Sequence, residues 1–135
     1  MAATLHLEVV SPERLLVSEP VEMVVVPGAE GYFGVLPLHM PLISTLRVGV
    51  IDVYNGGAIA ERYFVSGGFA EANATSCTVL VDDALPLASL TKAFVADRLT
   101  AAKALMQAAA TDEERRRAAE AIVNAEAMAE YATAA

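Results

Sequence analysis

The hydrophobic pattern of this chain changes its period near Pro86, and this change limits the possible folds more than any other feature. Before Pro86, apolar and polar residues alternate, as at Leu5 and Leu7, which is the pattern of half-buried β-strands. After Pro86 the sequence is rich in alanine, leucine and charged residues, and apolar positions recur at steps of three and four, which predicts helices. We therefore predict a β domain, residues 1–86, and a helical domain, residues 87–135.

Short strands follow one another closely in the first domain. The predicted strands are 5–9, 14–18, 21–26, 42–46, 48–54, 59–66, 69–74 and 78–82. Asn55, Gly56 and Gly57 supply the positive φ that a tight hairpin turn requires, and Gly67 and Gly68 mark a further turn or bulge. No helix is predicted between the strands, which favours antiparallel pairing. The predicted fold is a flattened antiparallel β-sandwich.

The second domain is predicted to be an antiparallel hairpin of two helices. The apolar stripe of the first helix is Val95, Leu99, Ala102, Met106 and Ala109. The sequence TDEE then has the form of a capping box, in which Thr111 accepts from the backbone N–H of Glu114 and the Glu114 side chain reaches back. The stripe of the second helix is Ala118, Ile122, Ala125, Ala129 and Ala132. Because alanine buries little area, we expect the two helices to be held together weakly.

Composition and charge exclude several classes of function. The 135 residues include 17 acidic and 9 basic ones, giving a formal charge of −8, which disfavours binding to nucleic acid or to anionic lipid and favours a basic partner. No run of about 18 apolar residues is present, so we expect no membrane insertion. Cys77 is the single cysteine, and the N-terminus lacks the pattern of a signal peptide. We therefore expect a reducing, cytoplasmic location.

Motifs for catalysis or ligand binding are few. Cysteine, histidine and carboxylate residues do not have the spacing of a metal site, and we expect neither a metal nor a cofactor. The glycines of VPGAEGYFGVLPLHMP, residues 26–41, do not match a phosphate-binding motif, and no helix follows them. We interpret this stretch as a folded-back surface loop in which each glycine supplies a positive φ or a close backbone approach. His39 has no serine or cysteine nearby in sequence, so a structural or interface role is favoured over that of a catalytic base.

The same stretch carries a resemblance to a known family. VPGAEGYFGVLPLHMPLISTLRVGVI, together with LHLEVVSPERLL, YFVSGGFAE, TVLVDDA and the helical tail, resembles the epsilon subunit of the bacterial F-type ATP synthase, which corresponds to the mitochondrial delta subunit. The resemblance extends over essentially the whole chain in the same order. It implies a β-sandwich followed by a two-helix hairpin.

The resemblance implies a non-catalytic role in the central stalk of the proton-translocating synthase. Such a subunit couples rotation of the c-ring to the gamma subunit and the catalytic head. It is peripheral, at the cytoplasmic face of the bacterial plasma (inner) membrane, and needs no cofactor. The residues implied to contact the c-ring loops are Glu30, Gly31 and Tyr32. Those implied to lie near the gamma subunit are His39, Met40 and Pro41. Many relatives have an acidic residue in place of Tyr32 and a glycine in place of Leu38.

The resemblance also makes the C-terminal hairpin a candidate regulatory arm. In many bacterial relatives the hairpin extends into the catalytic head and inhibits ATP hydrolysis, and some bind ATP through a motif resembling Ile/Leu-Asp-x-x-Arg-Ala. The aligned residues are Leu90, Thr91, Lys92, Ala93, Phe94 and Val95. They lack the aspartate and the arginine, so we expect no nucleotide-binding site and at most a weak inhibitory role. Candidate contacts with the alpha and beta subunits are Arg115, Arg116 and Arg117.

Two other classes of function remain open at this point. A stand-alone β-sandwich adaptor that binds a basic peptide would need neither a c-ring nor a gamma subunit, and it would be purified outside any membrane complex. A small hydrolase that uses His39 would need a nucleophile beside this histidine in the folded chain.

Overall fold

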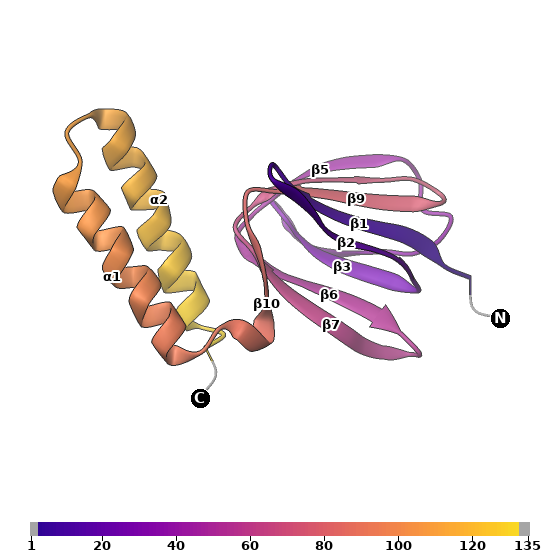
Figure 1. Cartoon of the computed structure of the whole chain (residues 1–135). Helices are drawn as coiled ribbons and strands as arrows, with labels where there is room; N and C mark the ends of the chain where they lie inside the picture. Colours follow the sequence, from indigo (N-terminus) through magenta and orange to yellow (C-terminus); the bar gives the residue numbers. More distant parts are fainter. Residues whose placement is uncertain (1–2, 133–135) are drawn as a thin grey trace. The chain divides into compact units, whose positions relative to one another are not determined.

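The computed structural model describes residues 3–132, so the first two and last three residues of the predicted domains lie outside the described part. The chain forms two compact units, Met1–Pro86 and Leu87–Ala135. The first contains strands and the second contains helices (Figure 1). This agrees with the change of hydrophobic period near Pro86.

The first unit is a β-sandwich made from one folded sheet. Its ten strands are β1 (Leu5–Ser11), β2 (Arg14–Val21), β3 (Met23–Gly28), β4 (Gly31–Val35), β5 (Leu42–Leu46), β6 (Gly49–Asn55), β7 (Ala58–Val65), β8 (Gly68–Ala72), β9 (Ser76–Val81) and β10 (Ala84–Pro86). The strand order is β10-β7-β6-β3-β5-β8-β9-β1-β2, and β4 pairs with β3. Strands β2 and β6 also contact each other, because the sheet folds back on itself (Figure 1). The predicted sandwich is confirmed.

One pairing differs from the all-antiparallel prediction. Strand β1 lies parallel to β9, whereas the other pairs are antiparallel. The two strands are far apart in the sequence, so no hairpin loop forces them to run in opposite directions. Local periodicity carries no signal for such a long-range pair.

The alternating pattern builds the core. On β1 the side chains of Leu5, Leu7 and Val9 are buried, whereas His6 between them is exposed. Valine dominates the inner faces, which suits strands because its branched side chain is stiff and packs well on a pleated surface. No polar or charged residue among residues 3–132 is fully buried. Each buried valine or leucine contributes roughly 1.5–3 kcal/mol of transfer free energy.

The stretch 26–41 is not one surface loop, as we predicted. Strand β3 continues to Gly28, a two-residue turn follows, and Gly31 begins β4, so that Gly28 pairs with Gly31. A Cβ on Gly28 would lie 2.7 Å from the carbonyl oxygen of Gly31, and Gly31 has a φ of 143°. Gly34 has neither a positive φ nor a close backbone approach. The prediction for that position is therefore wrong. The hairpin escaped prediction because β4 contains two glycines, which weaken a strand pattern.

Smaller differences concern strand ends. Strand β10 was also missed, since it has three residues and ends in proline, which strands rarely tolerate away from an edge. The turn at Gly56 and Gly57 is confirmed, with φ of 66° and 78°. Gly67, between β7 and β8, and Gly68, the first residue of β8, likewise have positive φ, 109° and 139°.

The second unit consists of two antiparallel helices, α1 (Lys92–Ala108) and α2 (Asp112–Ala129), after a short 3₁₀ turn (Leu87–Ser89) (Figure 1). Thr91 caps α1 by accepting from the N–H of Phe94 at 3.1 Å. The predicted cap of α2 is confirmed: Thr111 accepts from the N–H of Glu114 at 3.1 Å and donates to its carboxylate. Within residues 3–132, neither helix has the length and apolar character that crossing a membrane requires.

The predicted apolar stripes are correct except near the end of α2. Val95 and Ala102 on α1, and Ala118 and Ala125 on α2, are buried. Ala129 is exposed and Met128 is buried instead. Met128 has a long, adaptable side chain, whereas Ala129 is the last helical residue and has only a methyl group.

A steric test of strand packing follows from Gly68. A Cβ at this position would lie 1.9 Å from the carbonyl oxygen of Leu80, so Gly68→Ala must push β8 away from β9. We expect it to lower the free energy of unfolding by about 3 kcal/mol. Gly57→Ala is the matched control, because it also has positive φ but meets open space, and should cost only roughly 1 kcal/mol. Urea denaturation measures both; equal losses would contradict the close approach.

Candidate functional site

An apolar row crosses the outer face of the first unit. Pairing in register places Phe69 of β8 beside Leu80 of β9, Leu80 beside Val10 of β1, and Val10 beside Leu15 of β2. Residues paired in this way point to the same face of a sheet. Phe69 is 55% exposed, and Leu80 and Leu15 are exposed to a similar degree. These side chains lie outside the core cluster, so folding of the sandwich does not explain them.

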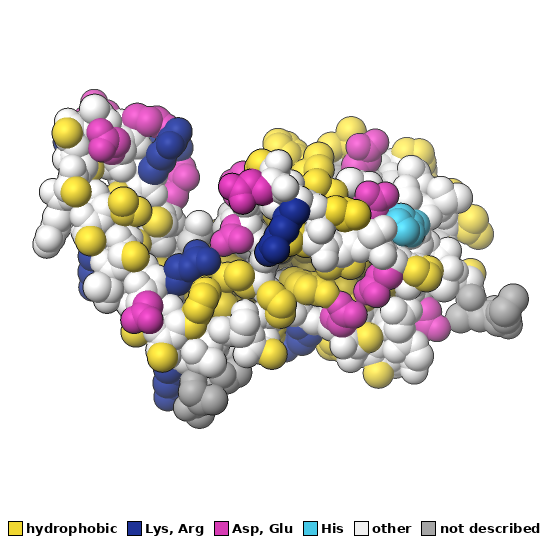
Figure 2. Space-filling model, in the orientation of Figure 1, with side chains coloured by type: hydrophobic (Ala, Val, Ile, Leu, Met, Phe, Trp, Pro, Cys, Tyr) yellow, Lys and Arg dark blue, Asp and Glu magenta, His cyan; other side chains and the backbone are white. Residues whose placement is uncertain are grey.

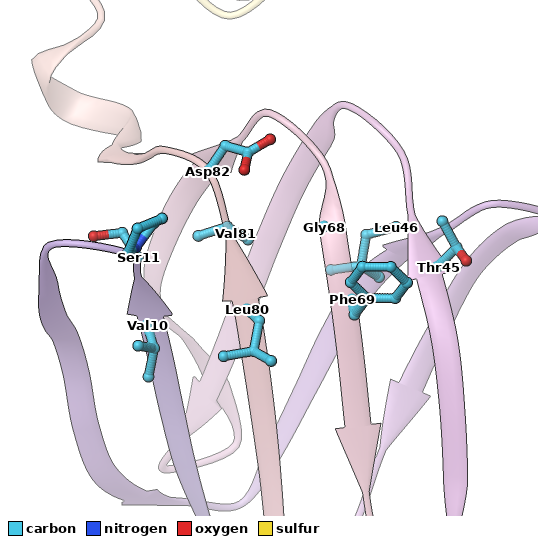
Figure 3. A pocket seen from close by; sticks show the side chains of 10 residues that line it. Val10, Ser11, Thr45, Leu46, Gly68, Phe69, Leu80, Val81 and Asp82 are labelled. Carbon is cyan, nitrogen blue, oxygen red and sulfur yellow. The ribbon is translucent and has the colours of Figure 1, made fainter.

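Three side chains of the apolar row, Val10, Phe69 and Leu80, line a groove of about 650 Å³, shown in Figure 3. The lining residues are Val10, Ser11, Pro12, Thr45, Leu46, Gly68, Phe69, Leu80, Val81 and Asp82. Most of them are apolar, and Asp82 adds one carboxylate that is exposed. An apolar groove with one acidic residue suits the apolar side chains of a partner that also carries basic groups.

The 36–41 loop adds two strongly exposed apolar side chains. Leu38 is 82% exposed and Met40 is 80% exposed. The loop is anchored because the N–H of Leu38 donates to the carbonyl of Ala74, 2.8 Å away, in the β8–β9 turn. Leu38 has a φ of 68° and is the one non-glycine residue with positive φ in residues 3–132. This conformation costs roughly 1–2 kcal/mol, and such strain is concentrated at functional positions.

Strand β5 connects the 36–41 loop to the apolar row. Ile43 of β5 is 72% exposed, and Thr45 pairs with Phe69 at the start of the row. We name the surface formed by Leu38, Met40, Ile43, Phe69 and Leu80 the docking face. Hydrophobic side chains reach the surface of the first unit among acidic ones in Figure 2. Exposed apolar side chains gathered on neighbouring strands are typical of interaction sites.

The β3–β4 turn projects beside the far end of β5. The N–H of Ala29 donates to the carbonyl of Thr45 at 2.9 Å, and Glu30 is exposed at the turn. A second groove, of about 360 Å³, lies between this turn and β5, and Ile43 lines it. The turn is therefore held against the sheet and presents a carboxylate next to an apolar side chain.

Tyr32 lies at the start of β4, but its polar end is bound within the protein. Its hydroxyl accepts from the N–H of Val50 at 3.2 Å, and the guanidinium of Arg47 lies 5.7 Å from the ring centroid. A Cβ on Gly49 would lie 2.6 Å from the Tyr32 hydroxyl, so the glycine leaves room for this contact. Tyr32 therefore joins the β3–β4 hairpin to β6, while its side chain stays partly exposed.

The two predicted contact regions lie at opposite ends of β5. The Ala29–Glu30 turn lies beside Thr45, near the C-terminal end of the strand. His39, Met40 and Pro41 precede Leu42, its first residue. Five residues of extended strand separate the two regions by roughly 13 Å. The predicted c-ring residues and the predicted gamma residues thus belong to two distinct ends of one surface.

His39 has no catalytic neighbour. Its Nδ1 lies 2.6 Å from the carbonyl oxygen of Met40, so this nitrogen carries the proton and donates. Within the described residues, its ring makes no hydrogen bond to a serine, threonine or cysteine. Burial raises the pKa of the Cys77 thiol to about 11, which keeps this thiol protonated and unreactive. Residues 3–132 contain no metal-binding group of three histidine, cysteine or carboxylate residues. A hydrolytic site at His39 therefore has no structural support.

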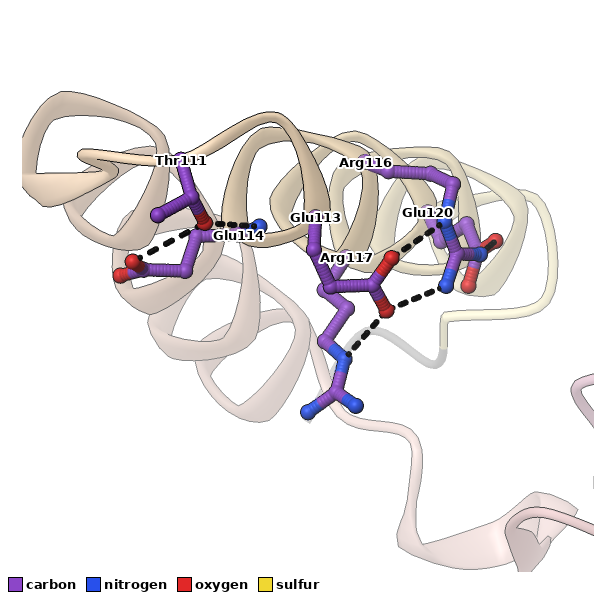
Figure 4. A network of polar contacts seen from close by, with 6 residues as sticks. All are labelled: Thr111, Glu113, Glu114, Arg116, Arg117 and Glu120. Carbon is purple, nitrogen blue, oxygen red and sulfur yellow. Dashed lines mark hydrogen bonds and ion pairs between the residues drawn. The ribbon is translucent and has the colours of Figure 1, made fainter.

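The arginines of α2 are paired with acidic residues of the same helix (Figure 4). Arg116 contacts Glu113 at 2.6 Å and Glu120 at 2.6 Å, and Arg117 contacts Glu113 at 3.1 Å. Arg115 contacts Asp112. Hydrogen bonds from Arg116 and Arg117 lower the pKa of the Glu113 carboxyl below its usual value. These arginines are neutralised locally, and binding an acidic partner would require them to exchange partners.

At the start of α1, the two residues that stand where the nucleotide motif has its aspartate and arginine make contacts within the helix. The hydroxyl of Thr91 is engaged as the helix cap, and the ring of Phe94 lies 5.1 Å from the guanidinium of Arg98. A phosphate or ribose would need an arginine and a carboxylate at this helix start. Thr91 and Phe94 offer neither.

Comparison with known proteins assigns the family. Residues 4–87 match the model of the ATP synthase delta/epsilon chain β-sandwich domain. The ATP synthase epsilon chain of Rhodospirillum rubrum is 55% identical over 128 residues, covering 95% of this chain and 96% of that protein. The chain belongs to the ATP synthase epsilon family. A second epsilon chain, from Paramagnetospirillum magneticum, is 48% identical and covers 96% of this chain and 97% of its own length.

Solved structures are consistent with this assignment to the epsilon family. A chain in the cryo-EM structure of the Euglena gracilis mitochondrial ATP synthase, OSCP/F1/c-ring, matches with a TM-score of 0.72 and 27% identity, covering 95% of this chain and 81% of that one. A chain in the central stalk/c-ring structure of the Tetrahymena thermophila mitochondrial ATP synthase matches with a TM-score of 0.66 and 11% identity, covering 96% of both chains. The latter likeness concerns the fold alone.

The sequence interpretation missed most of the docking face of this epsilon-family chain. It singled out Met40 but not Ile43, Phe69 or Leu80. The inward and outward alternation along each strand does indicate which apolar side chains face solvent. Cys77, Val79 and Val81 are buried on β9, which leaves Leu80 on the other face. In an uninterrupted apolar run such as VLV, however, the alternation is hidden.

The position of Tyr32 yields a test of its structural role. Tyr32→Phe removes the hydrogen bond to the Val50 N–H, and we expect it to lower the free energy of unfolding by about 1 kcal/mol. Glu30→Gln, at the exposed turn, should change it by less than about 0.5 kcal/mol. Chemical denaturation of the isolated chain measures both. If Tyr32→Phe were as stable as the wild type, the hydroxyl would not fix the hairpin.

Proposed function

We propose that this chain is a non-catalytic rotor subunit of a proton-translocating F-type ATP synthase, joining the c-ring to the gamma subunit. The observation that carries the proposal is the docking face, a set of exposed apolar side chains on neighbouring strands and the 36–41 loop that the core of the sandwich does not use. Membership of the epsilon family supports the assignment to the synthase. As such a subunit, the chain is peripheral, at the cytoplasmic face of the bacterial plasma membrane.

The gamma subunit is the proposed partner of the docking face. His39, Met40 and Pro41 lie at one end of this face, and the apolar row lies at the other end. The net charge of −8 and the carboxylate of Asp82 in the groove favour a partner segment that combines apolar and basic side chains. The strained backbone of Leu38 presents an exposed side chain, which a bound partner would bury.

The loops of the c-ring are the proposed partner of the β3–β4 turn. Glu30 provides an exposed carboxylate there, and Gly31 permits the backbone with φ of 143°. Tyr32 contributes mainly by holding the hairpin through Val50 and Arg47. A turn fixed in this way transmits force better than a mobile loop, because little energy is lost in its reorganisation.

The C-terminal hairpin is proposed as an accessory arm without nucleotide control. An inhibitory contact of Arg115, Arg116 and Arg117 with acidic segments of the alpha and beta subunits would have to replace their pairs on α2, so we expect weak inhibition at most. Calorimetric titration of the isolated chain with ATP should show no saturable heat. Tight binding that depends on Phe94 or Thr91 would overturn this part of the proposal.

Substitution on the docking face tests the proposed contact with gamma. Phe69→Glu places a charge where the partner must bury an apolar ring. We expect a loss on the order of 2 kcal/mol in binding to the gamma subunit, or roughly thirtyfold in Kd. Ile59→Glu is the control, because Ile59 is exposed on β7, away from this face. Titration calorimetry with purified gamma measures both.

The fold of each variant is checked by its unfolding transition, which should be unchanged because both side chains face solvent. Wild-type affinity of a folded Phe69→Glu chain, or equal losses in the two variants, would show that gamma binds elsewhere.

A further inference from the structure

Acidic side chains lie along one side of the apolar row. Two residues further along the strands, the register pairs Glu71 of β8 with Thr78 of β9, and Thr78 with Glu8 of β1. Residues two apart on a strand point to the same face and lie about 7 Å apart. Glu71 is exposed, and the side chain of Glu8 is 42% exposed. Two carboxylates therefore stand on the outer face next to the row.

Carboxylates also lie on the opposite side of the row. Asp82 follows β9 directly, two residues beyond Leu80, and lines the groove (Figure 3). Glu13 is exposed in the turn that joins β1 to β2, two residues before Leu15. We call these two pairs, Glu8 with Glu71 and Asp82 with Glu13, the acidic borders. The apolar row lies between them.

The acidic borders are not neutralised within the protein. Among residues 3–132, no lysine or arginine forms an ion pair with any of these four carboxylates. Glu8 contacts only the imidazole of His6, at 3.6 Å, which carries a charge only when it is protonated. On α2, by contrast, the arginines at 115–117 are each paired with an acidic residue. The borders therefore keep their negative charge for the cations of a partner.

The dimensions of the row fit a helix laid across the strands. From Phe69 to Leu15 the row crosses three intervals between strands of about 4.8 Å, roughly 14 Å in all. A helix of about ten residues has this length, and its side chains three and four residues apart are separated by about 5–6 Å. A helix also carries side chains on both flanks of its apolar stripe, whereas successive side chains of an extended strand point to opposite faces. A helix can therefore contact the row and both acidic borders at once, which a single extended strand cannot.

We propose that the segment bound to the apolar row is an amphipathic helix of the gamma subunit, with lysine or arginine residues on both flanks of its apolar stripe. The inference rests on the proposed docking of gamma to this face, and it adds what kind of segment binds and across which strands it lies. The apolar stripe covers the row, and the cations meet Glu8 and Glu71 on one side and Asp82 on the other. Long basic side chains suit these positions because their methylene groups cover apolar surface while their charged ends stay in water.

The row and its borders have separate roles in this arrangement. Apolar side chains at the centre of an interface provide most of the affinity. Charges at its rim act mainly on the rate of association and on its salt dependence. Removal of border carboxylates should therefore have a modest, salt-sensitive effect, unlike the loss expected for Phe69→Glu.

Neutral variants of one border test the charge contact. The double variant Glu8→Gln/Glu71→Gln removes two carboxylates with little change in side-chain size, and Glu126→Gln, exposed on α2, is the control. In titration calorimetry with purified gamma at low salt, the double variant should bind roughly fivefold more weakly than the wild type. This difference should vanish at about 0.5 M salt. Glu126→Gln should bind like the wild type at both salt concentrations.

Synthetic peptides test the helical form of the partner. The first probe is a peptide of about 14 residues with a leucine stripe flanked on both sides by lysines. The second has glutamates in place of the lysines, and the third has a proline at its centre, which breaks the helix. In NMR spectra of the labelled full chain, the lysine peptide should shift the amide signals of Phe69, Leu80 and Glu8. It should bind more tightly than either of the other two peptides.

Two results would overturn the inference while leaving the proposed docking of gamma intact. One is a Glu8→Gln/Glu71→Gln chain that binds gamma like the wild type at low salt, although Phe69→Glu weakens binding. The other is a proline or glutamate peptide that binds as tightly as the lysine peptide. If Phe69→Glu also leaves the affinity for gamma unchanged, gamma binds elsewhere, and the function proposed for this face fails together with the inference.

Discussion

Burial of the valine-rich inner faces between the two halves of one folded sheet is the interaction on which the first unit depends. The alternation that places Leu5, Leu7 and Val9 inside also decides which side chains must face solvent. A shift of one residue on any strand would reverse the two sets. Burial of the core residues therefore fixes the register of the strands. That register also determines which residues lie on the outer face.

On the outer face of the sandwich, packing of the core does not explain why several residues are apolar. Phe69, Leu80 and Ile43 are apolar although folding does not require it, and Leu38 keeps a strained backbone while its side chain remains in solvent. The glycines have the complementary role. Gly68 lets β8 approach β9 beneath the apolar row, and Gly49 leaves space for the Tyr32 hydroxyl. Core packing thus uses one face of these strands, and the docking that we propose uses the other.

Much of the fold could be predicted because its signals are local. The NGG turn, the TDEE cap and the stripes of α1 identify themselves within a few residues. Strand β4 could not be predicted, since two glycines weaken its pattern, and the parallel pairing of β1 with β9 depends on contacts far apart in the chain. At the end of α2, Met128 replaces Ala129 in the buried stripe because of side-chain length, which spacing does not measure.

The candidate site was predicted less completely than the fold. Resemblance to the epsilon family pointed to Glu30, Tyr32 and the 36–41 loop, and the structure adds that the Tyr32 hydroxyl is bound to the N–H of Val50. The apolar row depends on the register across four strands, from Phe69 of β8 to Leu15 of β2. Single-strand patterns cannot show that residues from separate strands form one surface.

The accessibility of Ile43 in the assembled synthase tests the central claim most directly. Ile43→Cys would be labelled with a maleimide in the isolated chain and in the complex, with Ile59→Cys as the matched control. Native Cys77 is buried and its thiol pKa is raised, so it gives little background. The account predicts rapid labelling of both variants in isolation and protection of Ile43→Cys alone after assembly. Equal labelling of Ile43→Cys in both states would contradict the docking of a partner on this face.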